Sequence, residues 1–171
     1  MRPTPDQDAR YLDAAAEHGG AMQRLASATE ANPERRRDLL QDMHVALWRS
    51  FASYDGRCSV RTWVYRVAHN VAASHVDRER RTRGAVPLDE AAEMPDGADI
   101  SIEVEQSRAI ARLHELIRQL KPPDRQIITL YLEELDAAAI AEITGLSPGA
   151  VATRISRLKS HLAAKFHEIA P

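Results

Sequence analysis

The stretch that decides the fold is Asp136-Ala-Ala-Ala-Ile140-Ala-Glu-Ile143-Thr-Gly145-Leu-Ser147-Pro148-Gly149-Ala-Val151-Ala-Thr-Arg154-Ile155-Ser-Arg157-Leu158. Ile140 and Ile143 share one face of a short first helix, and Gly145 stands where a helix end favours a positive φ. Ser147 followed by Pro148 predicts the start of a second helix, because serine caps helix N-termini and proline suits the first helical position. The stretch therefore predicts a helix-turn-helix.

The second helix of this stretch has one apolar and one polar face. Its apolar residues recur at steps of four, three and four, which predicts an inward stripe of Val151, Ile155, Leu158 and Leu162. The side chains on the far side are Thr153, Ser156, Arg157 and Ser160, with Arg154, Lys159 and His161 on the flanks. Residues 147–165 contain four basic residues and no acidic one, a local charge of +4 in a chain of net charge −2.

A small, polar and cationic helix face suits the major groove of DNA, where arginine reads guanine and serine or threonine bonds to several bases. Arg157 lies opposite the apolar stripe, so we expect it to point into the groove. Arg154 flanks that face and is better placed for a phosphate. The alternative is a helical hairpin whose charged face is only solvated.

Composition sets the class of protein. The 171 residues are the length of one ordinary domain or two small ones, and the few aromatics and glycines, without alternating strand patterns, predict an all-α protein. Cys58 is the only cysteine, so no disulfide forms within the chain. No run approaches the roughly 20 apolar residues of a membrane span, and the amino terminus lacks a signal-peptide core. We therefore expect a cytoplasmic protein without membrane insertion.

Charge is distributed unevenly along the chain. Residues 61–83 hold six arginines against two acidic residues, a net +4, whereas residues 88–105 hold seven acidic residues and no base, a net −7. Pro87 directly precedes this acidic stretch, and Pro95 and Gly97 lie within it, which favours a flexible linker. We expect two small helical domains, residues 8–84 and 104–170, joined by a flexible acidic linker over residues 85–103.

The first domain is expected to begin with two helices. One covers about residues 9–28, where the Gly19-Gly20 pair could interrupt it. The other covers about residues 34–51 and faces inward with Leu40, Met43 and Leu47. Its outer face mixes polar and apolar side chains: Asp38, Asp42, Val45 and Arg49, with Gln41 and Trp48 at the edge. Such a face suits a protein partner, and a plain solvated face fits the same periodicity.

A segment rich in aromatic and basic residues follows a turn predicted at Asp55-Gly56. It reads Ser59-Val-Arg61-Thr-Trp63-Val-Tyr65-Arg66-Val-Ala-His69-Asn70 and continues into a basic helix that ends near Arg83. Aromatic rings can stack on splayed bases, guanidiniums bind phosphates and an amide reads a base edge, as single-stranded nucleic acid requires. The alternative, open for Trp63 and Tyr65, is that the rings are ordinary core.

These blocks together resemble the extracytoplasmic-function (ECF) branch of the sigma-70 family of bacterial RNA polymerase sigma factors. Asp38-Leu-Leu-Gln41-Asp42 resembles the family's polymerase-docking segment, Arg61 to Asn70 its promoter-melting and minus-ten segment, and Leu120 to Leu162 its minus-thirty-five domain. The resemblance implies that core polymerase binds Asp38, Gln41, Asp42 and Trp48. It implies DNA contacts for Arg61, Trp63, Arg66, His69 and Asn70 at the minus-ten element, and for Thr153, Arg154, Ser156, Arg157 and Lys159 at the minus-thirty-five element.

The resemblance also implies that Asn70 lies in a loop forming a pocket for one flipped base, with Arg66 and His69 nearby. The implied partners are core RNA polymerase, promoter DNA as duplex minus-thirty-five and melted minus-ten elements, and an anti-sigma factor. We expect no cofactor, no metal and no enzymatic activity. The chain departs from the family at Ala137-Ala-Ala139 and Ala152, so its second domain is expected to make fewer or different DNA contacts.

Two other classes of protein remain as alternatives. A sigma mimic would titrate an anti-sigma factor without binding DNA, but such mimics lose DNA-facing bases, and this chain keeps Arg66, Asn70, Arg154 and Arg157. A helix-turn-helix regulator acting without polymerase would leave the segments 38–42 and 63–70 unexplained.

Overall fold

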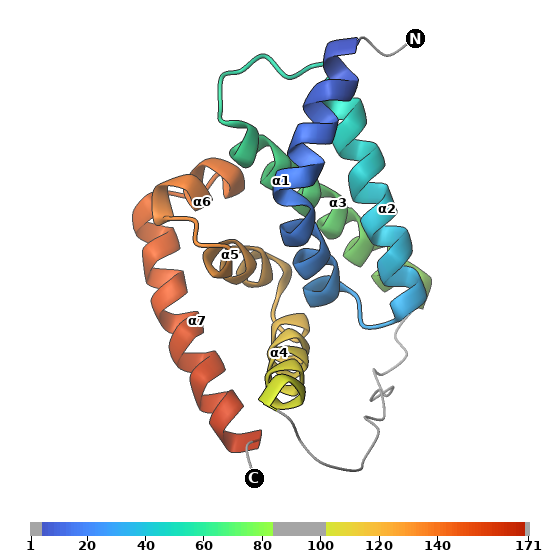
Figure 1. The fold of residues 1–171 in the computed structure, drawn as a ribbon. Coiled ribbons are helices and arrows are strands. Elements are labelled where there is room, and N and C mark those ends of the chain that lie inside the picture. Colours follow the sequence, from blue (N-terminus) through green and yellow to red (C-terminus); the bar gives the residue numbers. More distant parts are fainter. Residues whose placement is uncertain (1–4, 84–101, 170–171) are drawn as a thin grey trace.

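Seven helices and no strand make up residues 5–83 and 102–169, the part of the chain that the structure, a computed structural model, describes (Figure 1). The helices are α1 (Pro5–Thr29), α2 (Pro33–Ser50), α3 (Val60–Arg83), α4 (Ile102–Arg118), α5 (Pro122–Leu132), α6 (Ala137–Thr144) and α7 (Pro148–Ile169). The all-α class expected from the sequence is confirmed. Most of the expected linker lies outside the described residues, and its last two residues, Ile102 and Glu103, begin α4.

Helices α1, α2 and α3 pack around one apolar core. Its largest fully buried side chains are Met22, Leu39, Met43, Leu47 and Val64. Asn32 caps α2 by accepting hydrogen bonds from the backbone N–H groups of Glu34 and Arg35, next to a proline at the first position. The inward positions of Met43 and Leu47 are confirmed, whereas Leu39 takes the fully buried place expected for Leu40, which is half-buried.

Helix α1 is continuous, so the possible break at Gly19-Gly20 does not occur. Buried residues flank the pair on both sides, His18 before it and Ala21 and Met22 after it. A glycine in a helix interior costs about 1 kcal/mol relative to alanine. Packing of both halves of α1 against neighbouring helices outweighs that local preference.

The helix-turn-helix forms as its sequence predicts. Asp136 caps α6 by accepting from the N–H of Ala139 at 2.8 Å, and Gly145 ends this helix with a φ of 77°. The hydroxyl of Ser147 accepts from the N–H of Ala150 at 3.2 Å, which caps α7. Val151 is fully buried, and α7 therefore packs with its apolar stripe on α4, α5 and α6.

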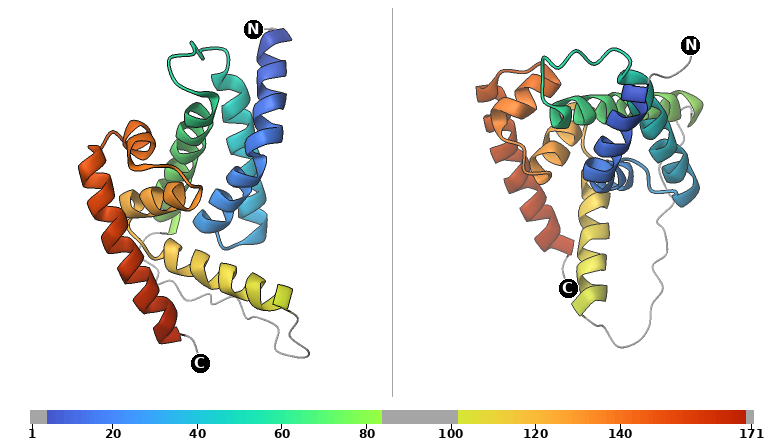
Figure 2. Two further views of the ribbon diagram at one scale, coloured as in Figure 1. Left: turned by 60° about the vertical axis from the view of Figure 1, so that its left-hand side comes forward. Right: turned by 45° about the horizontal axis from the view of Figure 1, so that its top comes forward.

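The two helical groups, α1–α3 and α4–α7, lie against each other (Figures 1 and 2). Helix α4 contacts α1, and the short helices α5 and α6 contact α3. Ala21, Ala28 and Tyr65 from the first group belong to the same buried cluster as the core of α4–α7. The chain therefore places the two groups in direct contact, which the sequence did not indicate.

Candidate nucleic-acid interface

The outer face of α7 is open to solvent. Thr153, Ser156 and Arg157 are exposed, as is Ser160 one turn further along. Arg157 forms no ion pair with any side chain in the described ranges. The hydroxyl of Thr153 donates to the backbone carbonyl of Gly149 at 3.0 Å, so this side chain lies along its own helix. Among the described residues of α7, Arg157 is therefore a cation on this face without an ion-pair partner.

The basic residues on the flank of α7 contact the support helix α5. Nη1 of Arg154 donates to Oδ1 of Asp124 at 3.0 Å, and both side chains are about a third exposed, 39% and 33%. The ammonium of Lys159 lies 5.3 Å from the centre of the Tyr131 ring, a cation–π contact. The two flanking cations are therefore engaged within the protein, unlike Arg157.

Asn70 lies within helix α3, and the expectation that it lies in a loop is wrong. The residues buried before and after it, Val64, Ala68 and Ala72, continue one helical period across the position, so the helix has no reason to end there. Asn70 is exposed, and Arg66, one turn earlier on the same side of α3, is half-buried.

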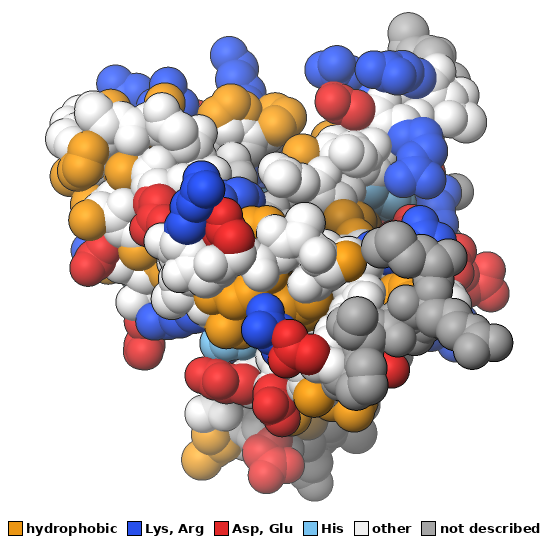
Figure 3. Space-filling view, turned by 90° about the horizontal axis from the view of Figure 1, so that it is seen from above, with side chains coloured by type: hydrophobic (Ala, Val, Ile, Leu, Met, Phe, Trp, Pro, Cys, Tyr) orange, Lys and Arg blue, Asp and Glu red, His pale blue; other side chains and the backbone are white. Residues whose placement is uncertain are grey.

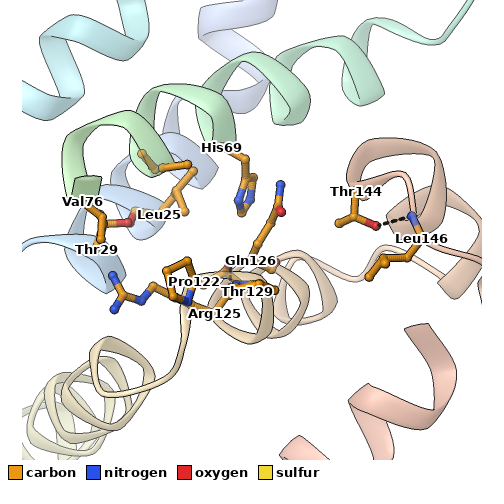
Figure 4. Close-up of a pocket in the computed structure, with 13 residues that line it drawn as sticks. Leu25, Thr29, His69, Val76, Pro122, Arg125, Gln126, Thr129, Thr144 and Leu146 are labelled. Carbon is orange, nitrogen blue, oxygen red and sulfur yellow. Dashed lines mark hydrogen bonds between the residues drawn. The ribbon is translucent and has the colours of Figure 1, made fainter. Parts of the chain in front are cut away.

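His69 faces away from Asn70, because neighbouring helical residues differ by about 100° in direction. It is only 4% exposed and lines a cleft of about 360 Å³ between α1, α3, α5 and α6. Figure 4 shows His69 pointing from α3 towards Gln126 of α5. Burial lowers the pKa of His69 from 6.5 to about 3, so the imidazole is neutral. The structure does not bring His69 together with Asn70 and Arg66.

The two aromatic rings of α3 pack inside the protein, which is the alternative kept open for them. The indole Nε1 of Trp63 donates to Oγ of Ser50 at 2.9 Å, and the ring lies 5.2 Å from that of Tyr54. Tyr65 is 6% exposed, and burial raises the pKa of its phenol. Trp63 is half-buried, so part of the indole still reaches the surface.

Two arginines of α3 contact the second helical group. Nη2 of Arg61 donates to the backbone carbonyl of Glu133 at 2.7 Å, and its guanidinium lies 5.8 Å from the centre of the Tyr65 ring. Nη2 of Arg66 donates to the carbonyl of Glu142 at 3.3 Å and lies 3.9 Å from its carboxylate. The sequence offered no signal for these contacts, because their partners lie more than 70 residues away in the chain.

The outer face of α2 carries Asp38, Gln41 and Asp42 on the surface, next to Val45, which is 40% exposed. Trp48 is half-buried and contacts α1. Its indole Nε1 donates to Asp8 of α1 at 2.8 Å, and its backbone carbonyl accepts from the amide of Gln7. Trp48 therefore fastens α2 to α1, in addition to any contact that it makes with a partner.

Side chains of opposite charge are concentrated at different parts of the surface. In Figure 3, Lys and Arg gather along the upper edge of the molecule, and Asp and Glu are more frequent towards the lower part. Among the described residues, no three His, Cys, Asp or Glu side chains are grouped so that they could hold a metal ion. None of the helices in residues 5–83 and 102–169 is long and apolar enough to cross a membrane.

Comparison with known proteins identifies two family regions. Residues 15–82 match the model of Sigma-70 region 2, and residues 110–162 match that of Sigma-70, region 4.

Three curated relatives span most of the chain. SigW, an ECF RNA polymerase sigma factor of Bacillus subtilis strain 168, is 26% identical over 96% of this chain and 92% of its own length. The RNA polymerase sigma-H factor of Pseudomonas aeruginosa is 30% identical over 74% of this chain and 70% of its own. The ECF sigma factor RpoE of Cereibacter sphaeroides is 32% identical, over 71% and 69% respectively.

Two solved structures share the fold. The sigma factor RpoE in co-crystals with the anti-sigma factor NepR, from Bartonella quintana, has a TM-score of 0.71 at 16% identity and covers 94% of this chain and 98% of its own. CnrH in complex with the cytosolic domain of CnrY has a TM-score of 0.66 at 22% identity, covering 94% and 89%. The fold, the two regions and the relatives agree, and the chain belongs to the ECF branch of the sigma-70 family, whose members direct RNA polymerase in transcription initiation.

Proposed function

We propose that this sigma factor uses three surfaces to bind core RNA polymerase and the two promoter elements. The outer face of α2 binds core RNA polymerase, α3 binds the melted minus-ten strand, and α7 enters the major groove of the minus-thirty-five element. The observation that supports this most is the outer face of α7, where Thr153, Ser156 and Arg157 are exposed on a helix whose start is fixed by the Ser147 cap. Helices that read a major groove present their side chains in this way.

Contact with polymerase is proposed for Asp38, Gln41 and Asp42. Their side chains are exposed at one face of α2, and the two carboxylates suit a basic surface on the partner. Val45 adds an apolar side chain to the same face. Trp48 supports this surface indirectly, because its bond to Asp8 fixes how α2 sits on α1.

Recognition of the minus-ten strand is proposed for Asn70 with Arg66. The two residues are four apart on α3, so an amide that can bond to a base edge lies beside a guanidinium that can bind a phosphate. Arg61, Trp63 and His69 complete the set that the family resemblance suggests. Their present contacts with Glu133, Ser50 and the cleft would have to change before they meet DNA.

The remaining partners follow from the family. RNA synthesis belongs to the polymerase, and this chain supplies promoter recognition and strand separation. RpoE of Bartonella quintana was solved with an anti-sigma factor, and we propose that an anti-sigma factor also controls this chain.

The test is transcription in a purified system. The chain is mixed with core polymerase and genomic DNA, and the 5′ ends of the transcripts are sequenced. We expect start sites that share a minus-ten and a minus-thirty-five sequence. Transcripts without common upstream sequences would favour the sigma mimic. Promoter binding by the chain alone that does not change with polymerase would favour an independent regulator.

A further inference from the structure

The cleft that His69 lines has mostly apolar walls. Its volume of about 360 Å³ lies in the range of small-molecule sites, and it has room for about a dozen non-hydrogen atoms at roughly 30 Å³ each. Apolar side chains reach it from α1, α3 and α5 and from the turn after α6, among them Leu25, Ala72, Pro122 and Leu146. The cleft therefore has the size and the lining of a ligand site.

The residues that line the cleft follow α3 and α5 for about two turns. On α3 they extend from His69 to Val76, and on α5 from Pro122 to Thr129. Each of these stretches covers about 10 Å of helix at roughly 1.5 Å per residue. The lining of α3 between its two ends includes Ala72 and Ala73, whose small side chains leave room. An extended chain suits this shape better than a compact group.

Two polar side chains in the cleft, His69 and Gln126, form no hydrogen bond to another residue within residues 5–83 and 102–169. His69 is only 4% exposed, and in Figure 4 its ring points from α3 towards Gln126 of α5. Buried polar groups in folded proteins are nearly always hydrogen-bonded. A neutral imidazole and an amide can each donate and accept. Both side chains are therefore available to a polar group placed between them.

The cleft is also lined by a cation that has no acidic partner. Arg125 is half-buried, and its Nη2 donates to the backbone carbonyls of Arg118 and Leu120. Its Nε is buried without a hydrogen-bond partner, and no carboxylate among the residues that the structure describes pairs with this guanidinium. Burial and the neighbouring Arg118 lower the pKa of Arg125. Buried charges in proteins are usually paired, so an anion would complement this site.

The polar groups occupy different places in the cleft. In Figure 4 the Arg125 guanidinium lies on the side of Val76 and Thr29. The facing pair of His69 and Gln126 lies apart from it. A ligand that satisfies both places needs a negative charge, an apolar stretch and, further along, a group that both donates and accepts hydrogen bonds. A hydroxyl group does both.

We propose that this cleft binds an amphipathic small molecule, a medium-chain carboxylate with a hydroxyl group at its far end. The carboxylate pairs with Arg125, the hydrocarbon chain lies against α3 and α5, and the hydroxyl bonds to His69 and Gln126. A charge-assisted bond to the carboxylate and burial of the chain both favour binding. The test uses neither polymerase nor DNA, so its result is independent of the function proposed above.

The first measurement compares three probes by calorimetric titration of the full chain, below the concentrations at which the probes form micelles. ω-Hydroxydecanoate carries both polar groups, decanoate lacks the hydroxyl, and decanol lacks the carboxylate. A probe without one of these groups leaves its protein partners unpaired in the cleft. We therefore expect ω-hydroxydecanoate to bind about tenfold more tightly than either of the other two.

Substitutions assign the two ends of the ligand. Arg125→Gln removes the charge, and we expect it to abolish the advantage of ω-hydroxydecanoate over decanol. Gln126→Leu removes the amide, and we expect it to reduce the advantage of ω-hydroxydecanoate over decanoate. Lys121→Gln and Gln119→Leu make the same changes at exposed positions between α4 and α5, outside the lining of the cleft. Both controls should keep the wild-type order of the probes.

A third substitution keeps the test decisive if Arg125→Gln does not fold. Ala73 lines the cleft and is exposed, so Ala73→Leu fills space in the cleft without entering a core. We expect it to lower the affinity for ω-hydroxydecanoate about tenfold. Ser74→Leu adds the same bulk at the exposed neighbour, which does not line the cleft, and should bind like the wild type.

The position of the ligand is checked by amide chemical shifts in NMR spectra. We expect ω-hydroxydecanoate to shift the signals of residues 69–76 and 122–129. Shifts confined to another surface, or an unchanged affinity in Ala73→Leu, would overturn the proposal. Equal affinities of the wild type for the three probes would also overturn it, because neither polar end would then be recognised. If no probe binds at millimolar concentration, the cleft holds only water and the proposal fails.

Discussion

Arg154 of α7 is tied to Asp124 at the start of α5, through a hydrogen bond of 3.0 Å from Nη1 to Oδ1. The bond joins α7, the helix that we propose to read duplex DNA, to its support helix α5. The sequence predicts that Arg154 contacts a phosphate, and in the structure its guanidinium is paired with the carboxylate of Asp124. A phosphate contact by Arg154 would therefore require this ion pair to break.

Asp124→Asn should strengthen duplex binding. Without the carboxylate, Arg154 is free to bind a phosphate, and each added phosphate contact steepens the salt dependence by about one unit of slope. The measurement is duplex affinity of the full chain over a salt series. Glu105→Gln, an exposed residue of α4, controls for the change in net charge. An unchanged slope in Asp124→Asn would mean that Arg154 does not reach the backbone.

Arg157→Ala should flatten base preference at one position of the minus-thirty-five element. Arg157 is exposed and forms no ion pair in the described ranges, and a bidentate contact to guanine contributes about 1–3 kcal/mol of discrimination. Binding to a complete set of element variants measures this. Lys165→Ala is the control on the same helix, since Lys165 pairs with Glu168 near its far end. Identical preferences in wild type and Arg157→Ala would exclude this residue from base reading.

Local signals made the helix-turn-helix predictable from the sequence. The caps at Asp136, Gly145 and Ser147 act within three or four residues, and the apolar stripe starting at Val151 follows one helical period. The helix end at Gly145, the helix start at Ser147 and the apolar stripe formed as expected, and the structure adds the cap at Asp136. The bounds of α2 were also predictable, since the helix expected over about residues 34–51 is Pro33–Ser50 in the structure.

Contacts between distant parts of the chain were not predictable in this way. The carboxylate of Glu133 accepts hydrogen bonds from Arg24, which lies 109 residues away in the chain, and no periodicity or motif relates the two. That Asn70 lies within a helix was predictable, because Val64, Ala68 and Ala72 recur every four residues on both sides of it and are buried. The family resemblance suggested a loop instead. Trp63 and Trp48 are amphipathic side chains, and only the structure shows which neighbours they contact.

Asp42→Arg should weaken binding to core polymerase and leave the fold intact. The side chain is exposed, so its replacement changes the free energy of unfolding by no more than about 0.5 kcal/mol. A reversed charge in an interface costs much more, and we expect affinity to fall about tenfold or more. Glu34→Arg makes the same charge change in the first turn of α2 and serves as the control. Equal losses in both variants would show a general electrostatic effect.

Asn70→Ala should relax base preference at one minus-ten position and slow promoter opening. An amide bonded to a base edge contributes about 1–3 kcal/mol of discrimination at that base. A scan of promoter variants with the holoenzyme measures the preference. Ser74→Ala, an exposed position one turn later on α3, is the control. A scan in which Asn70→Ala keeps every preference of the wild type would remove this assignment.

The cleft between the helical groups makes stability depend on pH through His69. Burial lowers the pKa of His69 to about 3 in the folded chain, and the unfolded chain has the ordinary value of about 6.5. Arg125 of α5 is the charged residue among those lining the cleft, and α1 and α6 contribute only uncharged side chains. Because the unfolded chain binds the proton first, the contribution of His69 is complete above about pH 6.5 and is lost as the pH falls towards 3.

His69→Gln should therefore make the chain less sensitive to acid. Glutamine does not titrate, so we expect the melting temperature of this variant to fall less between pH 7 and pH 5 than that of the wild type, by about 3–5 °C. Some dependence will remain, because burial also lowers the pKa values of His18, His44 and His114. His161→Gln, at an exposed position of α7, is the control and should behave like the wild type. The measurement is thermal unfolding followed by circular dichroism at several pH values. If His69→Gln and the wild type lose the same number of degrees, His69 is not held neutral by burial in the cleft.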